Sequence, residues 1–251
     1  MNLLSVEQIT AGYGKNPVVS EVSVRADEGE IVAVVGPNGA GKSTALKAIF
    51  ALVARMAGRV VLEGRDLTDL PTHRLVGAGL GYVPQVDNVF PSMSVAENLE
   101  MGAYLTPSRA TERARQVLGI FPDLASAEHR RAGTLSGGQR NMLGMARALM
   151  LEPRVLLLDE PTAGLSPAYV QVVWDQVVRI ADTGTAVVVV EQNVARALRH
   201  AHRVYVLIAG RNRVDGPAAE IAGLDLAALF LGGAEHRAHD SSAPVEHGGV
   251  R

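Results

Sequence analysis

The sequence of 251 residues contains no cysteine, which excludes disulfide bonds, thiolate metal sites and cysteine nucleophiles. It has no strong excess of either charge, because 24 Lys and Arg against 26 Asp and Glu give a formal net charge of −2. This balance argues against a protein held on nucleic acid by bulk electrostatic attraction. No apolar run approaches the roughly 18–20 residues that cross a bilayer, and the N-terminus lacks the pattern of a secretory signal. We therefore expect a cytoplasmic protein that contacts a membrane only through a partner.

The composition is that of a folded chain. Hydrophobic residues make up 47% of the sequence and charged residues 20%, which suffices to bury a sizeable core. Short β-branched runs alternate with longer helical stretches, and this pattern predicts an α/β fold built on a largely parallel sheet. The predicted strands cover residues 3–10, 18–25, 31–35, 59–63, 80–83, 155–158, 186–190, 204–208 and 213–215, and the predicted helices cover 42–53, 94–104, 109–119 and 167–181, with two short helices before residue 231.

The hydrophobic pattern distinguishes two kinds of strand. Residues 3–10 and 18–25 alternate apolar with polar side chains, as half-buried antiparallel strands do, whereas residues 31–35 are continuously apolar and predict a buried central strand. Ser94 has capping-box spacing to the next Glu and should start a helix. Residues 85–131 as a whole predict a helical insert within the α/β body.

The end of the sequence differs in composition. Beyond residue 233 large apolar side chains almost disappear. We therefore predict one domain over residues 1–233 and a disordered tail over residues 234–251. His236 and His239 lie in this tail without other ligands nearby in the sequence, so a solvated tail is favoured over a metal site.

A phosphate-binding P-loop pattern, G-x-x-x-x-G-K-[ST], lies between the central strand and the next helix, the context that this motif requires. Backbone N–H groups of such a loop and the helix N-terminus attract phosphate oxygens. Lys42 would bring a positive charge to the β- and γ-phosphates, and Ser43 a hydroxyl oxygen to Mg²⁺. A plain glycine-rich turn would not explain strand, loop, Lys-Ser-Thr and helix in this order. The predicted loop residues are Gly36, Pro37, Asn38, Gly39, Ala40, Gly41, Lys42, Ser43 and Thr44.

A second acidic motif follows the apolar strand at 155–158. Asp159 and Glu160 stand at its C-terminal end, the Walker-B arrangement. Asp159 would hold Mg²⁺ through its water shell, and Glu160 would polarise the attacking water. Buried strands often end in acidic residues, but together with the P-loop the pair predicts phosphoryl transfer to water.

The segment Leu135-Ser136-Gly137-Gly138-Gln139 precedes a helical stretch. Here the sequence resembles the ATP-binding subunits of ABC transporters, whose signature is LSGGQ. A Ser N-cap with a Gly-Gly turn would account for the helix start but not for the other motifs. The resemblance covers about residues 2–233. It implies an α/β fold with a P-loop NTPase core, an N-terminal antiparallel β-subdomain and a helical signature subdomain over about 86–152.

The resemblance also implies roles for individual residues. Tyr13 matches the aromatic residue that stacks on adenine, although a lone loop tyrosine is equally often structural. Gln85 matches the glutamine that contacts Mg²⁺ or water and connects to the helical insert. In this family the residues Ser136, Gly137, Gly138 and Gln139 meet the γ-phosphate of ATP held by the opposite subunit. Met142 and Met145 on the signature helix are expected to pack in the core.

Two positions depart from the family pattern. Gln192 stands where the family usually has His, and Ser166 stands where the loop after Walker B usually has Asp. Both substitutions, with the Leu-Gly-Gly near residue 231, resemble the second ATPase subunit of branched-chain amino-acid importers. This resemblance implies ATP and Mg²⁺ as cofactors. It implies as partners a second, non-identical ATPase subunit that carries the His, transmembrane permease subunits and a substrate-binding protein, with no nucleic acid.

Other functions are less consistent with the sequence. The nearer alternative is another ABC transporter, either a urea or amide importer or a lipid or lipopolysaccharide exporter, although exporters of this kind normally keep the switch His. A soluble ABC ATPase of DNA repair would carry a long coiled coil between Lys42 and Leu135, where no heptad run occurs, and translation factors usually carry two cassettes. A small P-loop kinase leaves LSGGQ unexplained.

An apolar cluster precedes the predicted helix at 94–104. It consists of Val89, Phe90 and Met93. Two interpretations stay open: these side chains fill the core of the helical insert, or part of the cluster faces a groove that receives a permease helix, as in the family.

Overall fold

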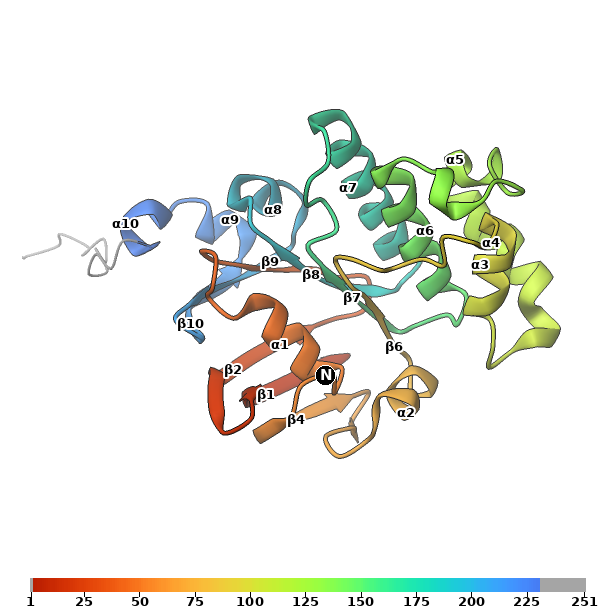
Figure 1. Ribbon diagram of the computed structural model, residues 1–251. Helices are drawn as coiled ribbons and strands as arrows, with labels where there is room; N and C mark the ends of the chain where they lie inside the picture. The colour runs from red at the N-terminus through yellow and green to blue at the C-terminus, as the bar shows by residue number, and fades with distance from the viewer. Residues whose placement is uncertain (1, 231–251) are drawn as a thin grey trace, which may run out of the picture.

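The computed structural model describes residues 2–230, and Figure 1 shows two sheets with helices around them. The larger sheet has six strands in the order β10-β9-β3-β8-β7-β6. All neighbouring strands in it are parallel except β10, which runs antiparallel to β9. The predicted largely parallel sheet is thus confirmed. Its strands are β3 (Ile31–Val35), β6 (Leu80–Val83), β7 (Val155–Asp159), β8 (Ala186–Glu191), β9 (Arg203–Ile208) and β10 (Arg211–Pro217).

The smaller sheet is antiparallel, as the alternation of the first two strands predicts, with the order β2-β1-β4-β5. β1 ends later than predicted and β4 starts earlier, because their pairing continues past register shifts. The register between β1 and β4 shifts after Glu7, next to Gln8 in the left-handed region (φ 48°). The strands are β1 (Leu4–Tyr13), β2 (Asn16–Ala26), β4 (Arg55–Leu62) and β5 (Arg65–Asp66).

The first helix is shorter than predicted. α1 (Lys42–Ile49) ends before residue 53 because Ala51 takes a left-handed backbone angle (φ 56°), which stops the helix. The Ser94 prediction is confirmed, since its side chain caps the next helix with Glu97 in a reciprocal capping box. The other helices are α2 (Thr72–Gly77), α3 (Val95–Gly102), α4 (Ala110–Ile120), α5 (Pro122–Ala125), α6 (Gly137–Leu149), α7 (Pro167–Asp182), α8 (Val194–His200), α9 (Ala218–Ile221) and α10 (Leu226–Phe230), and short 3₁₀ turns cover η1 (Pro107–Arg109) and η2 (Ala132–Thr134).

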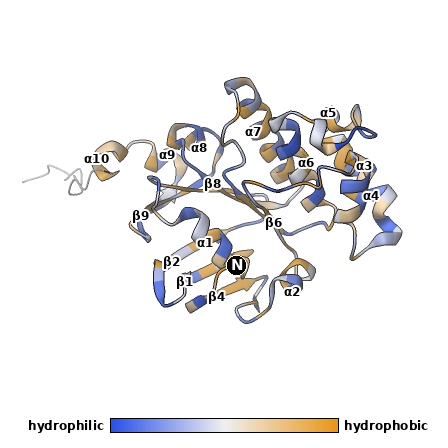
Figure 2. Ribbon diagram, viewed as in Figure 1, coloured by the Kyte–Doolittle hydropathy of each residue, from blue (hydrophilic) through white to orange (hydrophobic). Residues whose placement is uncertain are grey.

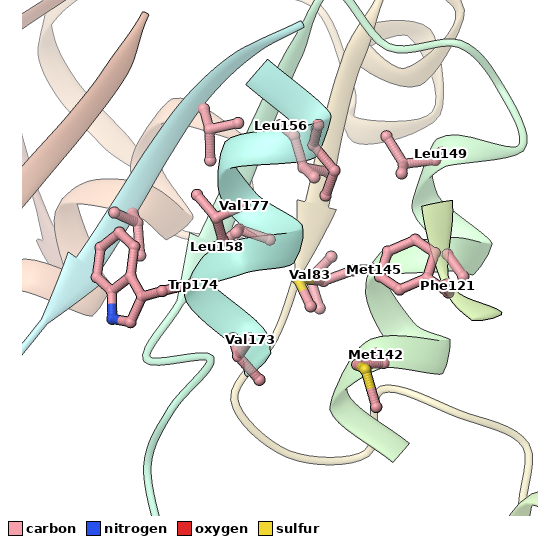
Figure 3. Packing of buried hydrophobic residues seen from close by; sticks show 14 of the residues in the cluster. Val83, Phe121, Met142, Met145, Leu149, Leu156, Leu158, Val173, Trp174 and Val177 are labelled. Atoms are coloured by element: carbon pink, nitrogen blue, oxygen red, sulfur yellow. The ribbon is translucent and has the colours of Figure 1, made fainter. Parts of the chain in front are cut away.

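Both faces of the six-stranded sheet are buried. Along β3, Ile31 and Val35 belong to a cluster with α6 and α7, whereas Val32 and Val34 belong to a second cluster with the antiparallel sheet and α1. This explains why residues 31–35 are continuously apolar. Orange ribbon accordingly runs through the interior in Figure 2, and Figure 3 shows the first cluster in detail. The core positions predicted for Met142 and Met145 are confirmed, because both belong to this cluster, and Figure 3 shows Met145 beside Phe121.

The predicted tail lies outside the described residues, as do His236 and His239. Among the helices of residues 2–230, none has the length and apolar character needed to span a bilayer. The predicted site residues lie at the carboxyl ends of parallel strands, where ligands bind in open α/β sheets. They follow or end β3, β6, β7 and β8, and they include Lys42, Gln85, Asp159 and Gln192.

Candidate nucleotide site

A cavity of about 200 Å³ opens where β3 passes into α1. The ammonium group of Lys42 lies folded back into this loop, where its Nζ donates hydrogen bonds to the carbonyl oxygens of Gly36 (2.9 Å) and Pro37 (3.0 Å). Burial lowers the pKa of Lys42 from its ordinary value, and the nearby carboxylates of Glu160 and Asp159 oppose that shift. The loop thus holds a buried cation beside two acidic side chains.

The glycines of the loop are required by its shape. Gly41 lies in the left-handed region (φ 92°), and a Cβ there would come within 2.6 Å of the Val19 side chain. A glycine-rich loop that leads into an eight-residue helix favours bound anions, because the helix N-terminus carries unpaired N–H groups. The cavity is lined by Val18, Asn38, Gly39, Gly41, Lys42, Ser43, Thr44 and Glu160.

The buried Asp159 carboxylate at the end of β7 is held from two sides. The Ser43 hydroxyl donates to its Oδ1 over 2.6 Å, and the Tyr82 hydroxyl donates to its Oδ2 over 3.2 Å. Mg²⁺ favours oxygen ligands and is usually bound by one or two carboxylates together with phosphate oxygens. The hydroxyl oxygen of Ser43 and the carboxylate of Asp159 fit that ligand set.

Glu160 receives two amide donors on the same oxygen. Gln85 Nε2 lies 3.1 Å and Gln192 Nε2 lies 2.5 Å from its Oε2. The Glu160 backbone is left-handed (φ 48°), and its N–H donates to the carbonyl of Val190 on β8. Three residues predicted from three separate motifs therefore meet at one carboxylate, which also lines the P-loop cavity.

The LSGGQ segment starts helix α6. Ser136 is its N-cap and forms a capping box with Gln139, with Gln139 N–H to Ser136 Oγ at 3.2 Å and Ser136 N–H to Gln139 Oε1 at 3.1 Å. Gly138 is buried, and a Cβ there would lie 2.4 Å from the Tyr169 ring. Within the described chain, the residues that line the P-loop cavity include neither this segment nor Tyr13, which is 59% exposed.

Comparison with known families decides among the sequence-based interpretations. Residues 19–163 match the model of the family described as "ABC transporter". The chain belongs to the ABC transporter family. As an ATP-binding member it binds ATP and hydrolyses it, and the predicted α/β ABC ATPase fold is confirmed.

Relatives from several organisms align with nearly the whole ABC chain. The probable branched-chain amino acid transport ATP-binding protein LivF of Archaeoglobus fulgidus is 42% identical over 87% of this chain and 94% of its own length. The high-affinity branched-chain amino acid transport ATP-binding protein BraG of Pseudomonas aeruginosa is 38% identical over 92% of this chain and 100% of its own. The lipopolysaccharide export ATP-binding protein LptB of Escherichia coli K12 is 33% identical over 88% and 93%.

Solved structures agree on the architecture. A nucleotide-free ATP-binding cassette from an ABC transporter superposes with a TM-score of 0.83 at 26% identity and covers 94% of this chain and 100% of its own. The ADP conformation of MJ1267, an ATP-binding cassette of an ABC transporter, gives a TM-score of 0.82 at 26% identity over 92% and 99%.

Three residues of this ABC site were not predicted from the sequence: Tyr82, Thr162 and Glu191. Tyr82 holds Asp159, and Thr162 donates from its hydroxyl to the buried carboxylate of Glu191, whose other oxygen accepts from the Gln192 backbone N–H at 3.1 Å. Burial raises the pKa of Glu191. For Thr162 and Glu191 a signal was present in the sequence, because Thr162 follows Glu160 by two residues and Glu191 directly precedes Gln192.

The apolar cluster before α3 divides between two environments. Val89 is 9% exposed and packs in the core of the ABC helical region, so the docking interpretation is wrong for it. Phe90 is 42% exposed, with the Arg147 guanidinium 4.8 Å from its ring centroid, and Met93 is partly buried. Phe90 lines a groove of about 500 Å³ with Phe50, Val76, Leu80, Gly81, Tyr82, Met101, Gly102, Tyr104, Arg147, Ala148, Leu151 and Pro153.

Proposed function

We propose that the chain is the ATP-hydrolysing subunit of an importer for branched-chain, hydrophobic amino acids. The observation that carries this proposal is its similarity to LivF and BraG over 87% and 92% of its length, at 42% and 38% identity. Lipopolysaccharide export is the second candidate, supported by the similarity to LptB, but that similarity is lower at 33% identity.

The site residues have assigned roles in this proposal. The P-loop N–H groups and Lys42 bind the ATP phosphates, and Tyr13 offers its exposed ring to the adenine. Ser43, Asp159 and Gln85 supply oxygen ligands for Mg²⁺. When bound, Mg²⁺ would neutralise charge on the phosphates.

Glu160 orients and polarises the attacking water and accepts its proton. Gln85 and Gln192 hold the carboxylate of Glu160 in place through the two hydrogen bonds to its Oε2. This geometry is supported by the position of Glu160 at the wall of the P-loop cavity.

The signature segment, residues 136–139, serves a neighbouring ATPase subunit in this proposal. In this chain it lies apart from the residues that line the P-loop cavity. A second, non-identical ATPase subunit would bring its own signature to Lys42 and receive Ser136 and Gln139 at its own nucleotide. The neutral Gln192 supports such an asymmetric pair. The partner would then contribute a second nucleotide site, in which the switch residue is an ionisable His.

A permease helix would occupy the apolar groove that Phe90 lines. Apolar side chains are exposed along it, among them Phe90, Met101 (47%) and Tyr104 (55%), and an amphipathic helix binds such a groove by its apolar face. Docking there would place the chain on the inner, cytoplasmic face of the membrane through the permease. A substrate-binding protein would deliver the amino acid from the other side.

Affinity purification of the tagged chain from its native cells tests this function. We expect permease subunits and a second ATPase to co-purify, and ATP hydrolysis by the reconstituted complex to rise when leucine, isoleucine or valine is added with the binding protein. A Glu160→Gln complex is the matched control for hydrolysis at this site. Stimulation by urea, an amide or lipopolysaccharide instead would reject the amino-acid assignment.

A further inference from the structure

Tyr82 lies at the boundary between the apolar groove and the nucleotide site. Its ring stacks on Phe50, with ring centroids 5.3 Å apart and planes inclined by 24°, and both rings line the groove. Its hydroxyl donates to Asp159 Oδ2 over 3.2 Å. One half-buried side chain thus contacts both regions of the molecule.

Strand pairing fixes this position. In Figure 1 β6 runs beside β7 at the edge of the six-stranded sheet, and Tyr82 pairs with Leu157. Asp159 follows Leu157 by two residues and therefore lies on the same face of the sheet. The Tyr82 hydroxyl reaches diagonally along that face to the carboxylate, a separation that long aromatic side chains can span.

Helix α1 holds the same carboxylate from its other side. Ser43, in the first turn of α1, donates to Asp159 Oδ1, and Phe50, the C-cap of α1, stacks on Tyr82. Both carboxylate oxygens of Asp159 therefore accept hydrogen bonds from side chains associated with α1: Ser43 belongs to this helix, and Tyr82 stacks on its C-cap residue Phe50.

We propose that Tyr82 is a positioning residue that connects the groove to Asp159, so that the packing of its ring sets the orientation of the carboxylate that holds Mg²⁺. This inference rests on the proposed function, in which Asp159 serves that metal. Hydrogen bonds to metal-binding carboxylates change metal affinity by about 10–100-fold when they are removed.

A group that changes the packing around the Tyr82 ring would act on Asp159 through the Tyr82 hydroxyl, because the hydroxyl donates to the Oδ2 of Asp159.

The Tyr82→Phe variant removes the hydroxyl and keeps the ring against Phe50. Binding of ATP to the full chain is titrated without metal and then over a range of Mg²⁺ concentrations. We expect the metal-free ATP affinity to stay at the parent value and the Mg²⁺ midpoint to rise about tenfold. Tyr205→Phe is the matched control, because the Tyr205 hydroxyl accepts from the Arg25 N–H at 3.0 Å, away from Asp159, and should leave the midpoint unchanged.

The outcomes separate the two proposals. A parent-like Mg²⁺ midpoint in Tyr82→Phe, with a parent that depends on Mg²⁺, would reject the role of Tyr82 alone. A parent whose ATP binding does not respond to Mg²⁺ would reject the metal role of Asp159, and the Tyr82 proposal with it.

A double-mutant cycle tests the connection to the groove. Phe50→Leu removes the stacked ring at similar volume and should raise the Mg²⁺ midpoint severalfold, while Phe50→Tyr keeps the ring and should restore the parent value. In the Tyr82→Phe background, Phe50→Leu should have no further effect, because Phe50 acts through the hydroxyl. Additive effects of the two substitutions, or no effect of Phe50→Leu, would overturn the connection. Thermal unfolding of each variant checks that it remains folded.

Discussion

The side chain of Gln192 donates to the Oε2 of Glu160 over 2.5 Å, and Gln85 donates to the same oxygen. A glutamine amide can provide this hydrogen bond at any pH, but it cannot provide the positive charge of a protonated histidine. Hydrogen bonds from neutral donors are roughly half as strong as charge-assisted ones. In the proposed mechanism we therefore expect Gln192 to hold Glu160 in place but to stabilise the charge of the transition state less than a protonated histidine would.

Glu160→Gln should preserve ATP binding and lower turnover on the order of 10²-fold or more, because the amide cannot accept a proton from water. The test measures nucleotide binding to the chain and ATP hydrolysis by the assembled complex. Thr162→Ser, which keeps a hydroxyl for Glu191, is a neighbouring control that should turn over normally. Hydrolysis by the Glu160→Gln complex at the parent rate would contradict the assignment of Glu160 as the residue that activates the attacking water.

Lys42→Ala should weaken ATP binding about tenfold or more, because it removes a charge-assisted hydrogen bond to phosphate worth about 1.5–3 kcal/mol. In the structure the ammonium donates to the Gly36 and Pro37 carbonyls, so phosphate oxygens compete with these two acceptors for its N–H groups. Calorimetric titration with ATP measures the loss. Lys47→Ala on the same helix is the matched control and should bind like the parent; an equal loss in both variants would point to a general effect of charge.

Substitutions at the adjacent residues Val89 and Phe90 should affect different properties, stability at Val89 and transport at Phe90. Val89→Ala removes buried methyl groups from the helical region and should cost about 1–3 kcal/mol of unfolding free energy. Phe90→Asp should leave stability within about 0.5 kcal/mol, since its ring is 42% exposed, and should uncouple transport by placing a charge in the groove. Urea unfolding and transport by the complex measure the two effects. Unfolding of Phe90→Asp would assign Phe90 to the core as well.

The site residues that could be predicted from the sequence are those that belong to a motif at a fixed spacing from the end of a strand. Lys42, Asp159 and Glu160 are of this kind, because loop and strand place them without help from the rest of the fold. The contact of Tyr82 with Asp159 could not be predicted in this way. It depends on β6 lying beside β7, and hydrophobic periodicity gives strand existence but not strand order.

Local backbone geometry explains the other differences. The end of α1 depends on the left-handed angle of Ala51, a residue type that favours helix and so gave no stop signal. The burial of Val89 beside an exposed Phe90 depends on contacts of this segment with two helices, since Asn88 donates to Asn141 on α6 and Phe90 bonds to Asn98 on α3. The Asn98 amide holds the backbone of Phe90 on both sides, because its oxygen accepts from the Phe90 N–H and its nitrogen donates to the Phe90 C=O.

His200 should make the fold less stable in mild acid. Its ring stacks on the buried Trp174 at 4.9 Å between centroids, and burial lowers its pKa, with Arg199 acting in the same direction and Asp175 opposing. The folded state then binds fewer protons than the unfolded state between this lowered pKa and about 6.5. Unfolding free energy should therefore fall as pH drops from about 6.5 toward the lowered pKa.

Urea unfolding at pH 7.5 and 5.5 measures this effect. His200→Phe keeps a ring against Trp174 and should lose part of the pH dependence, whereas the exposed His73→Phe should keep it. Equal pH dependence in the parent and in His200→Phe would contradict the assignment.

In the proposed pair of ATPase subunits, we expect the two nucleotide sites to differ, because this chain carries Gln192 at the switch position and its signature lies apart from its own P-loop cavity. The chain alone should bind ATP but hydrolyse it slowly, because the opposite signature and the partner's switch residue are both missing. In the complex, Ser136→Ala should impair hydrolysis at the partner's nucleotide, while Gln192→Ala should reduce total turnover less than removal of the partner's switch His, since only a neutral donor to Glu160 is lost.

The Ser136 variant needs a control for helix capping, because Ser136 also caps α6 through Gln139. Ser94→Ala removes an equivalent capping box on α3 and should cost a similar stability, about 1 kcal/mol, without lowering hydrolysis at either nucleotide. Equal losses of hydrolysis in both variants would mean that capping alone explains the Ser136 effect. A homodimer of the purified chain with transport-level ATP hydrolysis would show that Gln192 supports full turnover by itself and that no second kind of subunit is required.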